Sequence, residues 1–157
     1  MTGSLIFITG ASGFIGSHVV LDSLKAGHRV RINVRRGDQI DELTARFSPA
    51  ASSPDQLKFV INPDISDSKA VGSALSDVEY IFHLASPTAN HTEPDFKTEF
   101  LKPAVKGTEA ILNAAALAPS VKRVVIVSSL LALMPLGTLR VPGYVVDGEY
   151  SVSSPPS

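Results

Sequence analysis

The sequence predicts an α/β fold in which helices cover a parallel, doubly wound sheet. Five short apolar or alternating runs are separated by segments with helical spacing of their apolar residues. Strands that alternate with helices in this way pair in parallel, with the helices as crossovers. Of the 157 residues, 44% are hydrophobic and only 18% are charged, so we expect a compact globular chain rather than a disordered one.

The first strand and helix are the most clearly marked. Leu5–Ile8 is apolar throughout, as expected of a strand buried on both faces. From Phe14 the apolar spacing becomes helical, and Lys25 followed by Gly27 indicates the helix end. Arg29–Val34 then alternates strictly, which predicts the second strand.

The remaining elements continue this alternation. We expect a polar helix at 40–47, a loop at 48–54, a strand at 57–61, a weak helix at 68–75, a strand at 78–84, a loop at 85–94, a helical stretch at 95–118 and a fifth strand at 121–127. Pro103 implies a late start or a kink in the long helix. From residue 130 the pattern dissolves, which predicts a folded domain at 1–129 and a loop or tail at 130–157.

Composition and charge exclude several classes of function. The net charge of −1 provides no attraction to nucleic acid or to an anionic membrane. The absence of cysteine rules out disulfides, thiolate metal sites and a cysteine nucleophile, and we expect no metal site. No signal sequence is recognisable, and no run approaches the roughly 18 apolar residues of a membrane span. We therefore expect a cytoplasmic protein that binds neither membranes nor nucleic acid.

The turn between the first strand and the first helix is rich in glycine, with the sequence Thr9-Gly10-Ala11-Ser12-Gly13-Phe14-Ile15-Gly16. Gly10 allows a tight turn, Gly13 lacks the Cβ that would block a pyrophosphate, and Gly16 lets helix and sheet approach closely. Backbone N–H groups at the helix N-terminus favour phosphate. The pattern predicts a Rossmann-type dinucleotide site, with an ordinary strand–helix turn as the alternative. The expected contacts here are Gly10, Ser12, Gly13, Phe14, Ile15 and Gly16.

The second strand ends in Arg35 and Arg36, with no carboxylate before Asp38. At this position an acidic residue binds the ribose 2′-hydroxyl of NAD, whereas arginine accepts the 2′-phosphate of NADP. A guanidinium also matches phosphate with two parallel hydrogen bonds. We therefore expect NADP(H) in preference to NAD(H), and the alternative is that both arginines are solvated loop charges.

The third and fourth strands end in further candidate contacts. Asp64, with Ile65 after it, is either placed to meet the adenine amino group or is a turn residue. Leu84, Ala85 and Ser86 follow the fourth strand at the edge where ligands bind in open α/β sheets. We interpret His83, inside that strand, as a packed and hydrogen-bonded core histidine rather than a catalyst.

Together these residues resemble the extended short-chain dehydrogenase/reductases, in the branch of dihydroflavonol reductase, cinnamoyl-CoA reductase and the yeast-type carbonyl reductases. The matching segments are 9–20, 26–28 with 34–35, 64–67, 78–87, 102–103 with 107–108, and 121–129. The resemblance implies NADPH-dependent reduction of a ketone or aldehyde to an alcohol. In related enzymes the helix matching 95–118 contributes to a dimer, so a homodimer is a further expectation.

The family's catalytic residues are only partly matched. In the family a Tyr donates a proton to the carbonyl oxygen, a Lys four residues later lowers the pKa of that Tyr, and a Ser after the fifth strand helps to hold the oxygen. Ser129 matches this serine best, and Ser128 is the alternative; either could instead cap the strand. Every lysine lies at or before Lys122, so the sequence contains no Tyr-x-x-x-Lys.

We therefore expect the cofactor-binding part of such a reductase, lacking the family's C-terminal substrate-binding portion and inactive alone. Two alternatives stay open. One is a dinucleotide-binding protein without catalysis. The other is an enzyme like the sugar-nucleotide epimerases and dehydratases, against which Arg35 and Arg36 argue because those enzymes commonly carry an acidic residue there.

Overall fold

A computed structural model describes residues 3–86, 98 and 101–129. The chain divides into two compact units, residues 1–126 and 127–157, and the elements below belong to the first unit. The strands are β1 Leu5–Thr9, β2 Arg29–Val34, β3 Leu57–Ile61, β4 Tyr80–His83 and β5 Arg123–Ile126. The α-helices are α1 Phe14–Lys25, α2 Gln39–Phe47, α3 Ser68–Ala74 and α4 Lys102–Leu117, and two short 3₁₀ turns are η1 Ser48–Ala50 and η2 Pro54–Gln56.

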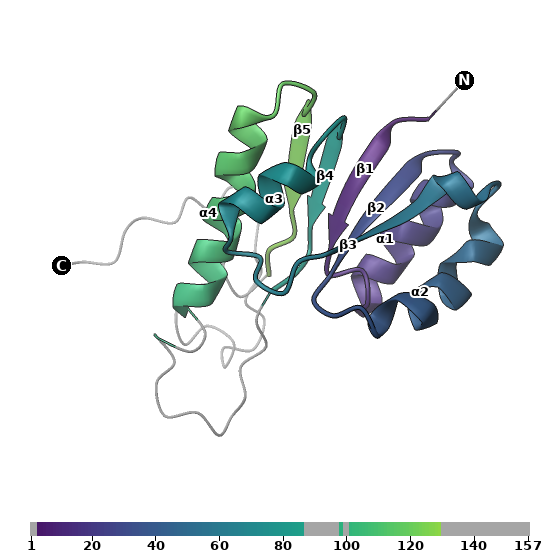
Figure 1. The fold of residues 1–157 in the computed structure, drawn as a ribbon, viewed down its shortest axis with the longest axis horizontal. Coiled ribbons are helices and arrows are strands. Elements are labelled where there is room, and N and C mark those ends of the chain that lie inside the picture. The colour runs from purple at the N-terminus through teal and green to yellow at the C-terminus, as the bar shows by residue number, and fades with distance from the viewer. Residues whose placement is uncertain (1–2, 87–97, 99–100, 130–157) are drawn as a thin grey trace, which may run out of the picture. The chain divides into compact units, whose positions relative to one another are not determined.

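The five strands form one parallel sheet in the order β3-β2-β1-β4-β5. Helices α1 and α2 cover one face of the sheet, and α3 and α4 cover the other (Figure 1). This is the doubly wound α/β arrangement that the sequence predicted. The chain moves outward from β1 through β2 to β3 and then returns to the other side of β1 as β4. The carboxyl ends of β1 and β4 therefore flank the point at which the strand order reverses, where ligands bind in such sheets.

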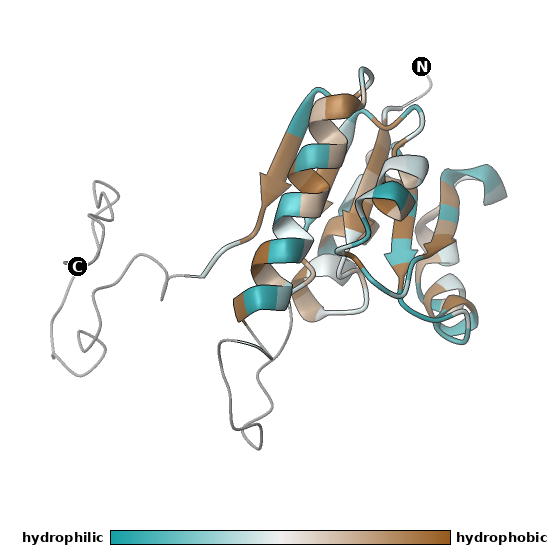
Figure 2. Ribbon diagram, turned by 60° about the vertical axis from the view of Figure 1, so that its left-hand side comes forward, coloured by the Kyte–Doolittle hydropathy of each residue, from teal (hydrophilic) through white to brown (hydrophobic). Residues whose placement is uncertain are grey.

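The core lies on both faces of the central strand. All five residues of β1 are buried. Ile6 and Ile8 pack with α1 and α2, whereas Leu5 and Phe7 pack with α3 and α4. This two-sided burial is why β1 is apolar throughout rather than alternating. Much of the sheet is coloured hydrophobic in Figure 2, while α4 alternates between hydrophobic and hydrophilic residues along its length.

The connection from α1 to β2 is closed by a glycine and by a distant glutamine. Gly27 has a φ of +83°, the left-handed conformation that ends many helices, and its N–H donates to the carbonyl of Leu24. The buried amide of Gln56 donates to the carbonyls of Leu24 (2.9 Å) and His28 (3.0 Å). Its oxygen accepts the N–H of Ser52 at 2.6 Å. One side chain thus joins this connection to the loop before β3.

Two strands are shorter than the sequence predicted. The fourth begins at Tyr80 rather than at residue 78, because the N–H of Val78 donates to Leu75 in the turn after α3. The fifth begins at Arg123 rather than at residue 121, because the N–H of Val121 donates to Ala118 in the turn after α4. Each strand also ends one residue early, the fourth at His83 and the fifth at Ile126. In both strands the turn that ends the preceding helix uses the first residues of the apolar run.

The long helix has the late start that Pro103 implied. The α-helix begins at Lys102, so Pro103 lies in the first turn, where a missing N–H is tolerated. Residues 95–97, 99 and 100, the beginning of the predicted stretch, lie outside the described residues, as does the predicted tail at 130–157. The predicted loop at 48–54 contains η1 and the start of η2. In the part of the chain that the structure describes, no helix has the length and apolarity to cross a bilayer.

Candidate dinucleotide-binding site

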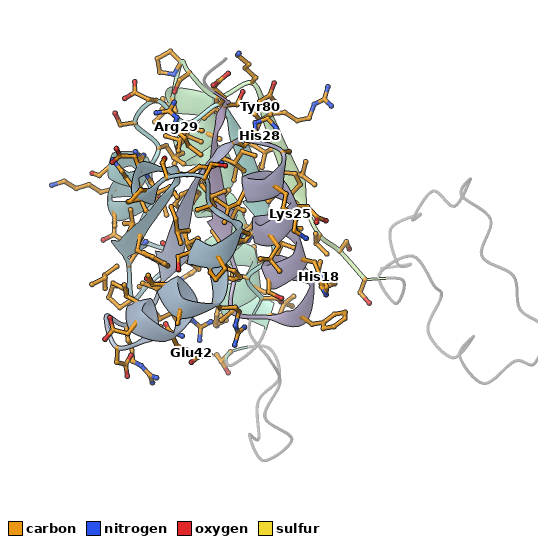
Figure 3. All side chains as sticks on the ribbon, turned by 90° about the vertical axis from the view of Figure 1, so that its right-hand side faces the viewer. His18, Lys25, His28, Arg29, Glu42 and Tyr80 are labelled. Atoms are coloured by element: carbon orange, nitrogen blue, oxygen red, sulfur yellow. The ribbon has the colours of Figure 1, made fainter. Side chains whose placement is uncertain are left out.

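A cleft of about 490 Å³ opens at the carboxyl edge of the sheet. Its walls come from the turn after β1, the ends of β2 and β3, the start of α2 and the segment after β4. The lining residues are Gly10, Ser12, Gly13, Asn33, Val34, Arg35, Gln39, Leu43, Asn62, Ile65, Leu84, Ala85 and Ser86. In Figure 3, His28, Arg29 and Tyr80 mark the opposite, amino edge, and Glu42 marks the end at which α2 begins.

Two glycines are required by the protein's own packing. Gly10 has a φ of +74°, and a Cβ on it would lie 2.6 Å from the backbone nitrogen of Ala85. A Cβ on Gly16 would overlap the carbonyl oxygen of Gly10. The turn is thereby pressed against both the end of β4 and the first turn of α1. The conformation of Gly10 agrees with the tight turn expected of it, whereas Gly16 packs against the turn residues Gly10 and Ala11 rather than against a strand.

Gly13 differs, because a Cβ there would meet little protein. Its nearest contact would be the carbonyl oxygen of Gly10 at 3.4 Å, and its φ of −77° suits any residue. Gly13 faces the cleft and is the N-cap of α1, whose first intrahelical bond is from the N–H of Ser17 to the carbonyl of Gly13 (2.9 Å). The N–H groups of residues 14–16 precede that bond and have no acceptor within the helix. Space for a ligand beside a helix N-terminus fits a pyrophosphate.

The two arginines after β2 have different surroundings. Arg35 lines the cleft. Arg36 donates to Asp38 at 3.1 Å in an exposed ion pair and does not line it. The turn that carries them is held by the side-chain oxygen of Gln39, which accepts the N–H groups of Arg35 (3.1 Å) and Arg36 (3.2 Å). Of the two predicted phosphate contacts, only Arg35 is brought to the cleft.

Asp64 is engaged in the turn after β3. Its Oδ1 accepts the hydroxyl of Ser66 (2.7 Å) and the backbone N–H of Ser66 (2.9 Å). These two bonds, together with the charge of Lys106, lower the pKa of Asp64 below its usual value. Asp64 lines a second, smaller cleft of about 290 Å³, which shares Arg35, Ile65, Ala85 and Ser86 with the first. Asp64 is therefore bonded within this turn, and its contact with adenine stays a prediction.

His83 is packed and hydrogen-bonded, as expected from its place in an apolar strand. It is only 3% exposed, its Nδ1 lies 2.8 Å from the hydroxyl of Thr9, and its Nε2 lies 3.4 Å from the hydroxyl of Thr108. Burial lowers its pKa below the usual 6.5, so the ring is neutral at pH 7. The same Thr9 hydroxyl accepts the N–H of Ala85 at 3.2 Å. This network ties β1, the end of β4 and α4 together beneath the cleft.

Several predicted contacts lie away from the cleft lining. Phe14 and Ile15 are 82% and 55% exposed, Gly16 is buried against the turn, and the contacts of all three with a cofactor stay predictions. Ser128 and Ser129 are exposed and belong to the second unit, and their catalytic role stays a prediction.

Five lining residues were not singled out from the sequence: Asn33, Val34, Gln39, Leu43 and Asn62. Two of them carry buried polar atoms without a hydrogen-bond partner among the described residues, Oδ1 of Asn33 and Nδ2 of Asn62. Asn62 is only 3% exposed, and its Oδ1 accepts the N–H of Asp64 at 3.2 Å. Asn33 lies at a polar position of the alternating strand Arg29–Val34, and Asn62 directly follows the third strand, so no signal in the sequence distinguished either residue.

Known proteins resemble the chain over most of its length. A ketoreductase of Aspergillus fumigatus is 39% identical over 148 residues, which cover 94% of this chain and 42% of the ketoreductase. An uncharacterized oxidoreductase of Schizosaccharomyces pombe is 47% identical over 133 residues, covering 85% of this chain and 39% of the relative. The chain thus spans about two fifths of the length of these relatives.

Solved structures lead to the same group of proteins. Yeast methylglyoxal/isovaleraldehyde reductase Gre2, complexed with NADPH, superposes with a TM-score of 0.73 at 31% identity, covering 83% of this chain and 38% of Gre2. Vestitone reductase from alfalfa gives a TM-score of 0.61 at 30% identity, covering 78% of this chain and 35% of vestitone reductase. The sequence profile of one family matches residues 6–140. With these relatives and this glycine-turn cleft, the chain belongs to the NAD dependent epimerase/dehydratase family.

Proposed function

We propose that this chain is the cofactor-binding part of an NADPH-dependent reductase that converts a ketone or aldehyde into an alcohol. One observation carries the choice of cofactor. Arg35 lines the cleft at the end of β2, and among the described lining residues there is no carboxylate. An acidic residue at this position would bind the 2′-hydroxyl of NAD and repel a 2′-phosphate, whereas a guanidinium attracts the phosphate.

The relatives support this assignment. Ketoreductases match the chain at 39% identity over most of its length, and yeast Gre2 is a carbonyl-compound reductase by name and has been crystallised with NADPH. When bound, the nicotinamide supplies or accepts a hydride. The residues of this chain bind and orient the cofactor: backbone N–H groups after Gly13 meet the pyrophosphate, and Arg35 meets the 2′-phosphate.

Proton transfer to the carbonyl oxygen would require a Tyr-x-x-x-Lys pair, which residues 1–157 do not contain. The sequence has no Tyr-x-x-x-Lys, and the chain covers about two fifths of its relatives. A tyrosine with a pKa near 10 is a poor proton donor without a nearby cation. We therefore propose that reduction requires the Tyr and Lys of a longer protein. Ser129 would help to bind the carbonyl oxygen.

Direct titration of the chain with reduced cofactors tests the proposal. Fluorescence of the reduced nicotinamide should report binding of NADPH with a dissociation constant at least about tenfold lower than that of NADH, the size expected of one additional charged contact. Equal affinity, or a preference for NADH, would reject the assignment and favour an epimerase-like enzyme. Failure to bind either dinucleotide would reject cofactor binding itself.

A further inference from the structure

The side chain of Gln39 is held in one orientation at the mouth of the cleft. Gln39 is the first residue of α2, and its Oε1 accepts two backbone N–H groups, from Arg35 at 3.1 Å and from Arg36 at 3.2 Å. Only the oxygen of an amide can accept a hydrogen bond, so the two accepted bonds decide which way the amide faces. Its amino group is consequently turned away from the backbone of the Arg35–Arg36 turn.

That amino group is available for a ligand. Among the described residues, none provides an acceptor for Nε2 of Gln39, although the residue is only partly exposed and lines the same cleft as Arg35. Two N–H donors in the same cleft as a guanidinium suit an anion with several oxygens, because both groups donate and neither accepts.

Several other groups of this turn are engaged elsewhere. The backbone N–H groups of Arg35 and Arg36 are used by Gln39, and the guanidinium of Arg36 is paired with Asp38. In the first turn of α2, the carboxylate of Glu42 is paired with Arg46 at 2.7 Å. Asp41 is exposed and does not line the cleft. Among the described side chains of this turn, the guanidinium of Arg35 and the amide of Gln39 are the donors that line the cleft.

We propose that Gln39 acts together with Arg35 in the choice between a 2′-phosphate and a 2′-hydroxyl. Its oxygen positions the turn that carries Arg35, and its amino group donates to the 2′-phosphate of NADPH. This inference rests on the proposed function, because it presupposes that the adenosine end of a dinucleotide lies in the cleft. It adds a residue that neither the glycine turn nor the arginines at the end of β2 would identify.

The substitution Gln39→Glu separates the two roles. A carboxylate oxygen continues to accept both N–H groups, so the turn is retained, whereas the amino group is replaced by a negatively charged oxygen. We expect the dissociation constant for NADPH to rise at least about tenfold, as for the loss of a hydrogen bond to a charged group, and that for NADH to change by less than about twofold. Adenosine 2′,5′-bisphosphate and adenosine 5′-monophosphate, measured by calorimetry, should show the same contrast.

A matched control places the same charge on the same helix away from the cleft. Ala45 is exposed on α2 and does not line the cleft, so Ala45→Glu should leave both affinities unchanged. If Ala45→Glu weakens the binding of NADPH as much as Gln39→Glu does, the effect is long-range charge repulsion and the proposal is wrong. If Gln39→Glu weakens the binding of NADPH and NADH equally, Gln39 only shapes the turn, and a hydrogen bond from its amino group to the phosphate is rejected.

A neutral variant keeps the test decisive if the carboxylate disturbs folding. Gln39→Met removes the donor and the acceptor without adding charge. It should weaken the binding of NADPH more than that of NADH, and the binding of adenosine 2′,5′-bisphosphate more than that of adenosine 5′-monophosphate. Unchanged discrimination in Gln39→Met would overturn the role of Gln39 while the unaltered chain still prefers NADPH. An unaltered chain that shows no such preference would instead overturn the proposed function, and the inference with it.

Discussion

The hydroxyl oxygen of Thr9 lies 2.8 Å from Nδ1 of the buried His83. The same oxygen accepts the N–H of Ala85, and Nε2 of the ring faces the hydroxyl of Thr108 at 3.4 Å. The arrangement that uses each group has Thr9 donating its proton to Nδ1 and the ring proton on Nε2, directed at Thr108. A neutral imidazole therefore connects the strand before the glycine turn with α4.

Acidification should weaken the fold through this histidine. Burial lowers the pKa of folded His83 below 6.5, so between 6.5 and the folded value the unfolded chain binds the proton and the folded protein does not. The contribution of neutral His83 to the stability of the fold is complete above pH 6.5. It is lost as the pH falls from 6.5 to the pKa of His83 in the folded protein. Melting temperatures measured between pH 8 and pH 5 should decrease on the acidic side, and less steeply in His83→Gln.

The exposed His18 provides the control for this prediction. His18→Gln should keep the full acidic slope of the unaltered protein. Equal slopes in His83→Gln and the unaltered chain would show that other groups cause the pH dependence.

Substitutions of Gly16 and Gly13 should affect different properties, the first the stability of the fold and the second the binding of NADPH. Gly16→Ala places a Cβ against the carbonyl of Gly10 and should destabilise the fold by about 1–3 kcal/mol, as overpacking does. Gly13→Ala meets only an oxygen at 3.4 Å and should leave the melting temperature nearly unchanged while NADPH binding is weakened. Thermal unfolding and cofactor titration of both variants check this, and a Gly13→Ala protein with unaltered affinity would argue against a pyrophosphate at this turn.

The arginines after β2 should differ in the same assay. Arg35→Ala removes the guanidinium that lines the cleft and should raise the dissociation constant for NADPH by at least about tenfold. Arg36→Ala removes an exposed partner of Asp38, and surface ion pairs contribute about 0–1 kcal/mol, so stability and affinity should hardly change. The reverse order of effects would mean that Arg36 leaves Asp38 to bind the phosphate.

Gly107 on α4 should control the position of Ile65. A Cβ on Gly107 would lie 2.8 Å from Cγ2 of Ile65, a stiff β-branched side chain that lines both clefts. Gly107→Ala should therefore displace Ile65 and weaken cofactor binding, although alanine favours the helix by about 1 kcal/mol. A titration that shows unchanged affinity would place Ile65 outside the binding surface.

Much of this fold can be predicted from the sequence because local signals and tertiary structure agree. The apolar run at Leu5–Ile8 is a strand buried on both faces, and Gly27 ends the first helix in the left-handed conformation that its residue type suggested. The glycine turn was also identifiable, since close backbone contacts at Gly10 and Gly16 leave no space for a side chain.

The remaining features depend on neighbours that are distant in sequence. Asn62 joins the cleft because β3 lies beside β2, and Gln39 is distinguished by two backbone N–H groups that its own side chain captures. Arg36 precedes Asp38 by two residues, yet its diversion into an ion pair requires the actual path of the turn. The starts of the fourth and fifth strands depended on hydrogen bonds from Val78 and Val121 to the turns after α3 and α4.

The amide of Gln56 has a consequence for how the protein opens. It closes the α1–β2 connection through Leu24 and His28 and the loop before β3 through Ser52. Neither segment can detach from this amide without leaving buried polar groups unpaired, so local fluctuations of the two are coupled. Amide protons in residues 26–29 and 52–57 should accordingly exchange with solvent as one cooperative unit, although more than twenty residues separate the two segments.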